Sequence, residues 1–325
     1  MSETKYFPTV EAIDKASQVL DEILEPTPFQ RNANLSDIYD AEVYLKREDL
    51  QMVRSYKIRG AYNKIRTIDP ELMKNGIVCA SAGNHAQGVA FSCSKLKIMG
   101  SIFMPVTTPR QKIEQVRMFG KEFIEIILTG DTFDAANSAA IKYAQDNNKT
   151  FIPPFDDPKV MEGQGTIGRE IFNQSKEPLD YIFVPIGGGG LASGLGAYIS
   201  RMSPSTKIIG VEPGGAPCMK AAIENGGPIK LEHIDKFVDG AAVQLAGTHT
   251  YEVCRQVLDD IVVVPEGAVC TTIIHMYNKS AIVVEPAGAL AVAALKFYKD
   301  KIKGKRVACV VSGSNNDITR MEEIR

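Results

Sequence analysis

The chain has 325 residues, of which 44% are hydrophobic and 23% are charged, a balance typical of a globular protein. Its formal net charge of −2 gives no bulk attraction to nucleic acid or to an anionic membrane surface. We expect neither a transmembrane helix nor a signal peptide, because there is no run of about 18 apolar residues and residues 1–10 have no apolar core. The six cysteines form no CxxC pair and the four histidines show no zinc spacing, so we expect reduced thiols, a cytoplasmic location and no metal site.

Helical and strand patterns alternate along the chain. The apolar spacing of residues 9–24 predicts a helix with Thr9 as its cap, which ends at the prolines of 26–28. The elements expected next are a strand at 42–49, a strand and a helix within 76–96, a strand at 100–105, a helix at 108–120, a strand at 125–130, a helix at 131–148, a short strand at 150–155 and a helix at 160–174. A strand, a glycine loop and a helix follow within 180–200, and strands are expected at 207–213, 260–266 and 306–314.

This alternation predicts an α/β fold with two open parallel-sheet domains, each sheet covered by helices on both faces. Length alone favours two domains. Residues 55–153 form a compact alternating unit that we expect to be a small domain, with 1–54 and 154–325 forming the large one. Binding residues in such folds lie in the loops that leave the carboxyl ends of the strands.

The glycine loop "IGGGGLASG" contains Gly187, Gly188, Gly189 and Gly190 between a predicted strand and a predicted helix. Glycines let the backbone approach a ligand, and the helix start favours an anion, so the loop suits a phosphate. A tight turn without a ligand is the plainer alternative. A dinucleotide site is a second one, because Gly187, Gly189 and Ala192 match G-x-G-x-x-A and Glu212 ends the next strand, where a ribose-binding acid would lie.

Three further stretches carry polar groups at strand or helix ends. "SAGNHAQG", residues 81–88, suits a carboxylate at a helix start, or is simply a capped helix. "VVSGSNND", residues 310–317, offers a serine hydroxyl for a ring nitrogen, or is a plain polar loop. "SYKIRG", residues 55–60, sets Lys57 in a half-apolar context, where a desolvated amine forms a Schiff base with an aldehyde; the alternative is a partly covered surface lysine.

The four stretches together match what pyridoxal phosphate and an amino acid require: a lysine, a phosphate loop, a carboxylate loop and a hydroxyl group. A dinucleotide enzyme would leave Lys57 and the "SAGNH" loop unexplained. A non-catalytic amino-acid sensor is a further rival, and it predicts threonine binding without turnover.

The motifs "SYKIRGA", "SAGNHAQG", "GQGTIGREI", "GGGGLASG", "VEPAGA" and "SGSNND", in this order, resemble those of the fold-type II pyridoxal-phosphate enzymes. Within that family the chain is similar to the threonine dehydratases (threonine ammonia-lyases) over nearly its whole length. The resemblance implies cofactor binding by Lys57, Tyr56, Asn84, Gly187, Gly188, Gly189, Gly190, Leu191, Glu285 and Ser312. It implies substrate-carboxylate binding by Ser81, Ala82, Gly83, Asn84 and His85.

The same resemblance implies individual roles. Lys57 would hold the cofactor covalently and then act as the base at the substrate Cα. Tyr56 would lie against the ring, Asn84 would bond its phenolic oxygen, Ser312 would face its nitrogen, and Glu285 would lie near it. The implied reaction is β-elimination of water from L-threonine to 2-oxobutanoate and ammonia, and from L-serine to pyruvate, as the first step of isoleucine biosynthesis.

Two positions depart from the related serine racemases, which are the alternative within the same fold. Ala82 stands where they have a second serine, so racemisation is not expected. Cys218 stands where they have a metal-binding acid, so Glu212 is better interpreted as a structural acid than as a metal ligand. The resemblance also implies a homo-oligomer, a dimer or tetramer, with no nucleic-acid partner. Biosynthetic relatives carry a C-terminal isoleucine-sensing domain that we expect to be absent from this chain. The chain is then either a naturally short, catabolic-type enzyme or a catalytic fragment of a longer one, and the tail at 312–325, which looks like a lead into such a domain, favours the fragment.

Overall fold

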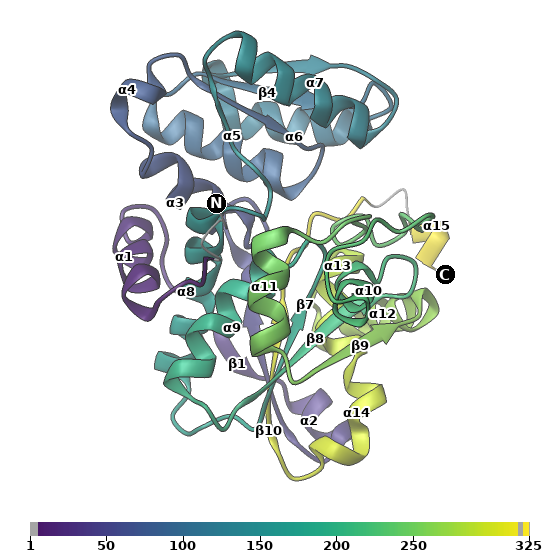
Figure 1. The fold of residues 1–325 in the computed structure, drawn as a ribbon. Helices are drawn as coiled ribbons and strands as arrows, with labels where there is room; N and C mark the ends of the chain where they lie inside the picture. Colours follow the sequence, from purple (N-terminus) through teal and green to yellow (C-terminus); the bar gives the residue numbers. More distant parts are fainter. Residues whose placement is uncertain (1–5, 318–320, 325) are drawn as a thin grey trace.

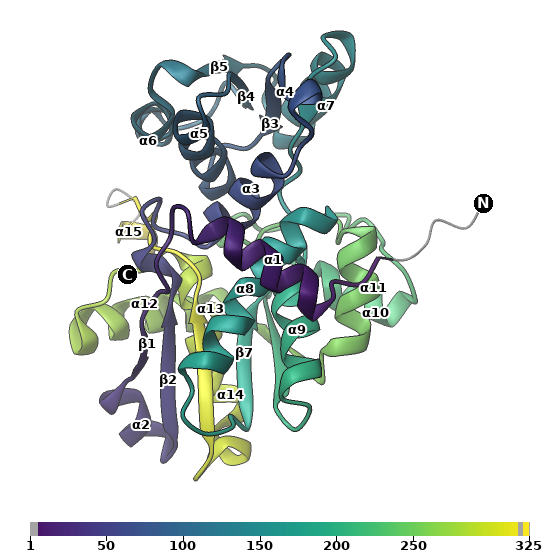
Figure 2. The same cartoon turned by 90° about the vertical axis from the view of Figure 1, so that its left-hand side faces the viewer.

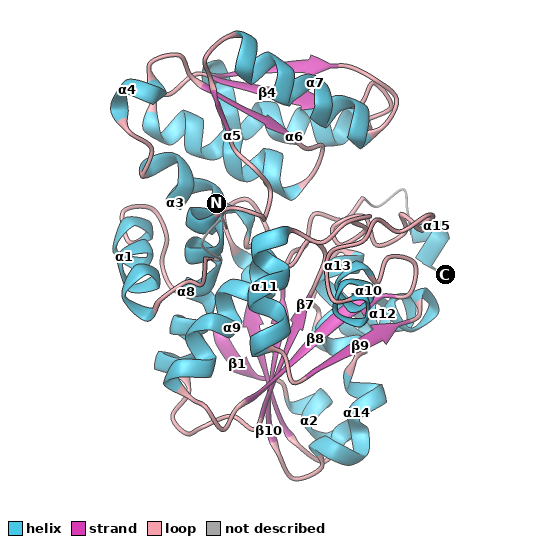
Figure 3. Cartoon of the chain, in the orientation of Figure 1, coloured by secondary structure: helices cyan, strands magenta, loops and turns pink. Residues whose placement is uncertain are grey.

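The computed structural model describes residues 6–317 and 321–324. Figure 1 shows two sheets, one above the other, and Figure 3 shows helices around each. The large sheet has six strands in the order β1-β2-β10-β7-β8-β9. These strands are β1 (Phe29–Arg31), β2 (Glu42–Arg47), β7 (Tyr181–Pro185), β8 (Lys207–Pro213), β9 (Asp260–Val264) and β10 (Arg306–Val311).

The small sheet has four strands in the order β5-β4-β3-β6, and all of its pairings are parallel. They are β3 (Ile77–Ala80), β4 (Gly100–Met104), β5 (Ile124–Leu128) and β6 (Thr150–Phe151). The large sheet is parallel from β2 to β9, and β1 joins its edge antiparallel, with Phe29 opposite Lys46. The predicted α/β fold with two parallel sheets is therefore confirmed.

Helices connect the strands and cover the sheets. The α-helices are α1 (Val10–Leu20), α2 (Ala33–Tyr39), α3 (Lys57–Arg66), α4 (Pro70–Met73), α5 (Asn84–Leu96), α6 (Arg110–Gly120), α7 (Phe133–Asp146), α8 (Pro158–Gln174), α9 (Gly190–Met202), α10 (Cys218–Asn225), α11 (Thr248–Val257), α12 (Glu266–Ser280), α13 (Pro286–Ala293), α14 (Leu295–Ile302) and α15 (Met321–Ile324). Two short 3-10 helices are η1 (Glu48–Leu50) and η2 (Lys121–Phe123). Figure 2 shows α3 at the junction between the two sheets. In the described part of the chain, no helix has both the length and the apolar character needed to cross a bilayer.

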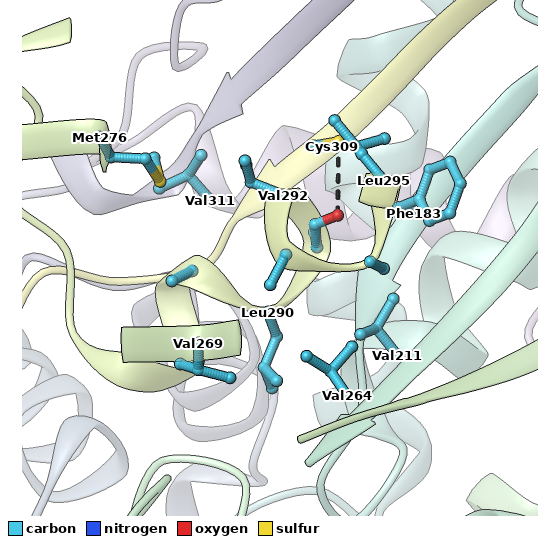
Figure 4. Packing of buried hydrophobic residues seen from close by; sticks show 14 of the residues in the cluster. Phe183, Val211, Val264, Val269, Met276, Leu290, Val292, Leu295, Cys309 and Val311 are labelled. Carbon is cyan, nitrogen blue, oxygen red and sulfur yellow. Dashed lines mark hydrogen bonds between the residues drawn. The ribbon is translucent and has the colours of Figure 1, made fainter. Parts of the chain in front are cut away.

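The strands of the large sheet are apolar and are buried on both faces of the sheet. In β10 every residue from Val307 to Val311 is buried, and so is every residue of α13, which packs on one face. Figure 4 shows this core, with Leu290 of α13 among Val211 and Val264, and with the Cys309 Sγ 3.6 Å from the carbonyl of Ala291. Burial of continuous apolar strands is what parallel sheets require, so the strand pattern sets the scaffold from which the loops emerge.

Most predicted elements lie where they were expected. β8 coincides with the strand predicted at 207–213, and the Thr9 hydroxyl caps α1 by accepting from the Ala12 amide at 3.2 Å. The strand predicted at 150–155 ends at Phe151, because prolines at 153 and 154 have no N–H for a sheet ladder. The edge strand β1 was not predicted. Residues 318–320 and 325 of the predicted tail lie outside the described residues.

Candidate active site

Lys57 opens helix α3 at the junction of the two sheets. Its amine donates a hydrogen bond of 2.9 Å to the carbonyl of Pro154 and lies 5.4 Å from the centre of the Tyr56 ring. Burial lowers the pKa of the Lys57 amine to about 8, although the carboxylate of Glu285 acts in the opposite direction. The half-apolar sequence around this lysine therefore corresponds to a covered amine, and not to a lysine in open water.

The "SGS" loop lies directly beside the lysine. Ser55 and Gly313 form an isolated antiparallel bridge, and the Tyr56 amide donates to the Ser312 carbonyl at 3.1 Å. The Ser312 side chain is buried, and its hydroxyl donates to the Ala287 carbonyl at 3.2 Å. A hydroxyl has one proton, so donating it to a ring nitrogen requires the group to turn away from Ala287.

Asn84, Glu285 and Asn315 form a hydrogen-bonded group that connects the two sheets. The Asn84 Nδ2 donates to Glu285 Oε1 at 2.7 Å, and the Asn84 Oδ1 accepts from Asn315 Nδ2 at 2.7 Å. Burial raises the pKa of Glu285 to about 7, as does Asp239, whereas the Asn84 hydrogen bond and the charge of Lys112 lower it. Near neutral pH this carboxyl group is therefore close to a change of protonation.

The glycine loop runs from β7 into α9 with its carbonyls turned toward the protein. The Gly188 carbonyl accepts from the Thr250 hydroxyl at 2.6 Å, and the Gly187 carbonyl lies 3.4 Å from the Cys218 thiol. Gly189 has φ +94° and begins α9 as its N-cap, with no side chain capping the helix. Amides at an uncapped helix start are free to hold an anion.

No side chain fits on this loop without displacing a neighbour. A Cβ at Gly188 would lie 2.4 Å from the Phe155 ring, and one at Gly189 would lie 2.5 Å from the Met219 methyl group. Leu191 differs from the glycines, because its side chain is buried in the core while its amide lies in the first turn of α9. The loop, together with the amides at the uncapped start of α9, is thus a candidate cradle for a phosphate group.

The "SAGNH" loop leads from β3 into α5 in the same way. Gly83 precedes the helix without a side-chain cap, its amide lies 3.2 Å from the Ser81 hydroxyl, and a Cβ on it would meet nothing within 4 Å. Ala82 packs beside the apolar core of the small sheet. The start of α5 therefore offers amides and open space to a small anion.

His85 does not offer its side chain to this opening. The imidazole is buried and its Nε2 lies 3.0 Å from the carbonyl of Ile152. Burial, followed by the charge of Lys57, lowers the pKa of His85 to about 3, so the ring is neutral. It is the backbone amide of His85, and not its ring, that lies at the helix start.

Glu212 is a structural acid. It is fully buried, and its two oxygens accept from the amides of Met219 at 2.7 Å and of Lys220 at 2.9 Å, at the start of α10. A carboxylate used in this way caps a helix and has no oxygen turned to a ribose. The dinucleotide interpretation of Glu212 was therefore wrong, while the alternative of a structural acid at the strand end is confirmed.

The segment between the small sheet and α8 holds residues of the candidate site that the sequence did not single out. Pro154 receives the Lys57 amine, and the Phe155 ring covers Gly188. Asp156 accepts from the amides of Thr248, His249 and Thr250 at 2.9, 2.9 and 3.1 Å, which fixes α11 and its Thr250 against the glycine loop. The sequence signal for these residues was the "PPFDD" stretch, a proline-rich break in the alternation of strands and helices.

The residues present fit pyridoxal phosphate. A side chain at Gly188 or Gly189 would collide with a neighbour, so the loop presents only its backbone. The Lys57 amine bonds the carbonyl of Pro154, and the next residue, Phe155, packs on Gly188. Asn84 and Glu285 form a hydrogen-bonded pair, and Glu285 is close enough to the lysine for its charge to act on the pKa of the amine. The cofactor requires a phosphate site, an amine for its aldehyde and polar partners for its ring, and these residues are suited to each.

The sequence matches a family and individual relatives. The model of the family described as pyridoxal-phosphate dependent enzymes matches residues 20–313. An L-threonine dehydratase, biosynthetic IlvA, of Halalkalibacterium halodurans is 58% identical over 316 residues, which are 97% of this chain and 76% of that protein. The protein of the same name from Bacillus subtilis is 56% identical and covers 97% of this chain and 75% of its own.

Solved structures agree. The processed form of threonine deaminase isoform 2 from Solanum lycopersicum has a TM-score of 0.92 and 36% identity, over 100% of this chain and 95% of that one. Maize serine racemase has a TM-score of 0.91 and 28% identity, over 98% and 97% of the two chains. The chain is therefore a member of the pyridoxal-phosphate-dependent enzyme family.

Proposed function

We propose that the protein is a threonine ammonia-lyase that converts L-threonine to 2-oxobutanoate and ammonia and L-serine to pyruvate. The observation that carries this proposal is the covered Lys57 amine, which bonds the Pro154 carbonyl next to the residue that covers Gly188 and which the charge of Glu285 influences. The names of the relatives, threonine dehydratase and threonine deaminase, support the same substrate.

The site residues divide the work among them. When bound, pyridoxal phosphate supplies an aldehyde for an amine and a ring that withdraws electrons from the substrate Cα. Lys57, with a pKa of about 8, holds the cofactor and then takes the proton from Cα. The amides of residues 187–191 bind the phosphate, and the start of α5 orients the substrate carboxylate through the amides of residues 83–85. Asn84 and Ser312 fix the ring.

The overall balance follows from these roles. Loss of the α-proton and of the β-hydroxyl removes one water, and water then adds at the carbon that bears nitrogen, releasing ammonia and the 2-oxo acid. Ser312 carries no charge, so it does not favour a protonated ring nitrogen, and a weaker electron sink suits a simple elimination. Ala82 has no proton to deliver on the face opposite Lys57, which favours a lyase over the racemase named among the structural relatives.

We infer the cellular setting from the relatives. The curated relatives are named biosynthetic, so we place this activity in amino-acid biosynthesis, at the first step toward isoleucine, in the cytoplasm. A homo-oligomer is part of the same proposal. So is the division of labour in which 55–153 binds the substrate carboxylate while 1–54 and 154–325 bind the cofactor.

The direct test is to incubate the protein, loaded with pyridoxal phosphate, with L-threonine and L-serine, and to measure 2-oxo acid and ammonia with and without isoleucine. We expect both products in equal amounts, and no turnover by Lys57→Ala. Saturable threonine binding without product would instead indicate a sensor.

Chiral analysis of the recovered serine tests the racemase alternative. The unchanged protein should leave L-serine as the only enantiomer. Ala82→Ser should introduce weak racemisation, because a hydroxyl on that face can transfer a proton and a positioned acid or base is worth about 10²- to 10⁴-fold. D-Serine formed by the unchanged protein would contradict the assignment of Ala82.

A further inference from the structure

Lys57 and Arg59 leave helix α3 on opposite sides. Successive helical residues are turned by about 100°, so residues two apart point about 200° away from each other. The Lys57 amine reaches the Pro154 carbonyl, whereas the Arg59 guanidinium enters the interior, where the side chain is 1% exposed. The orientation of one side chain about the helix axis therefore fixes that of the other.

Arg59 is held by two carboxylates from different elements. Its Nε and Nη2 each donate to Glu48 of η1 at 2.8 Å, and its Nη1 donates to Glu170 of α8 at 2.6 Å and to Thr166 of α8 at 3.0 Å. The Glu48 side chain is 0% exposed and also accepts from the Thr27 hydroxyl at 2.6 Å. Such a two-pronged grip fixes the plane of the guanidinium as well as its distance.

Lys46 of β2 completes the network. Its amine is 0% exposed, pairs with Glu170, and donates to the Thr27 carbonyl and to Gln174 Oε1, each at 2.8 Å. Two buried cations, the buried Glu48 and the largely covered Glu170 thus meet at the junction of β2, η1, α3 and α8. A buried ion network of this kind is often no more stable than an apolar cluster of the same volume, so stability alone does not account for it.

Close backbone contacts set the distance of α3 from its neighbours. A Cβ at Gly163 of α8 would lie 2.6 Å from the Arg59 carbonyl, and one at Gly88 of α5 would lie 3.2 Å from the Ile58 Cα. Because glycine has no side chain to interlock with its neighbour, these contacts do not fix the rotation of α3 about its own axis. Other side chains must fix that rotation. Helix side chains reach about 5–6 Å from the axis, so a turn of about 10° moves a side-chain end by roughly 1 Å.

We propose that Arg59, gripped by Glu48 and Glu170, is a positioning residue for Lys57: it fixes the rotation of α3 and so aims the lysine amine at its reaction partner. Because a misplacement of about 1 Å costs roughly 10²-fold in rate, the grip belongs to the catalytic geometry and not only to the fold. The turnover measurement rests on the proposed function, whereas the other measurements below do not.

The test compares Arg59→Lys with Arg169→Lys. Arg59→Lys keeps the charge and removes the two-pronged grip. Arg169 lies next to Glu170 on α8 and pairs with Asp14 at 2.8 Å in a partly exposed position, so it is a matched control. Three quantities are measured: kcat and KM for threonine, the rate at which apo-protein forms its covalent link with pyridoxal phosphate, and the visible circular dichroism of the bound cofactor.

We expect Arg59→Lys to lower kcat by about 10- to 100-fold with KM within about twofold, to slow the link, and to weaken the dichroism. Arg169→Lys should match the unchanged protein in all three. The proposal is overturned if Arg59→Lys lowers only the melting temperature and keeps kcat, link rate and dichroism.

The test still gives an answer if the variant does not fold or if the protein has no turnover. If Arg59→Lys does not fold, Glu170→Gln replaces it, because the amide keeps the volume at a position where the side chain is 11% exposed, and the same criteria apply. If the unchanged protein has no threonine turnover, the proposed function fails, and the link rate and the dichroism still decide whether Arg59 positions Lys57.

Discussion

At the scale of single residues, burial decides which groups at this site carry charge. Burial lowers the pKa of Lys57 to about 8 and that of His85 to about 3, and it raises that of Glu285 to about 7. Near neutral pH the imidazole is neutral, while the amine and the carboxyl group are each close to a change of protonation. The candidate site therefore holds an amine and a carboxyl group that both titrate near neutral pH, as groups at catalytic sites often do.

Glu285 should make the folded protein less stable as pH rises. Its folded pKa of about 7 lies above the ordinary 4.5, so the folded state binds more protons than the unfolded state between these values, and its contribution is lost as pH rises through about 7. Glu285→Gln should remove this loss. Without cofactor, the unfolding free energy of the variant minus that of the unchanged protein should therefore rise by about 3 kcal/mol from pH 4.5 to pH 7. Denaturant unfolding at several pH values measures it, and a difference that stays flat would contradict the raised pKa.

Ser312→Asp should change the kind of reaction. A carboxylate at this position would favour a protonated ring nitrogen and so a stronger electron sink. We expect slower formation of 2-oxobutanoate and more of side products such as those of transamination. The products of the variant are analysed and compared with those of the unchanged protein. Absorbance first confirms that the variant holds its full amount of cofactor. Normal elimination with no new product would show that Ser312 does not face the nitrogen.

At the scale of elements, the start of α9 and the loop before it form the proposed phosphate cradle. Gly188→Ala places a Cβ 2.4 Å from the Phe155 ring, so either the ring or the loop must move. We expect at least a tenfold weaker affinity for pyridoxal phosphate, which is about 1.4 kcal/mol, with a smaller change in apo-protein stability. Absorbance titration measures the affinity and thermal unfolding measures the stability.

Gly227→Ala is the matched control for the cradle. A Cβ at Gly227 would meet nothing within 4 Å, so the same substitution there should change neither quantity. If both variants bind the cofactor equally well, the phosphate lies elsewhere.

Local pattern predicted the elements better than it predicted the site. The apolar run of β8 and the cap of α1 are set by residues adjacent in sequence, so both were predictable. The hydrogen bond from Lys57 to the Pro154 carbonyl spans 97 residues, and a carbonyl has no residue-type signal. The edge strand β1 follows two prolines and pairs with β2 only in the folded sheet, which is why the prolines alone predicted a break.

At the scale of the whole molecule, the two sheets enclose the site from opposite sides. Lys112 of α6 pairs with Asp239 of the loop between α10 and α11 at 2.6 Å, and both charges act on Glu285. The lysine side chain is 24% exposed and the aspartate 35%, so solvent screening leaves the pair about 1 kcal/mol or less. Its position across the site matters more than its contribution to stability.

Lys112→Asp should raise KM for threonine several-fold, because it sets two negative charges against each other across the opening. The double variant Lys112→Asp, Asp239→Lys restores opposite charges and should recover part of the loss. Steady-state kinetics at low salt measures this coupling. Additive effects of the two changes would mean that the pair does not hold the two sheets together.

The most direct test of the whole account asks which residue carries the cofactor. Protein loaded with pyridoxal phosphate is reduced with borohydride, digested, and analysed by peptide mass. The account predicts yellow protein that bleaches on reduction and a pyridoxyl group on Lys57 alone. A tag on another lysine, or a colourless protein that binds a dinucleotide tightly, would contradict it.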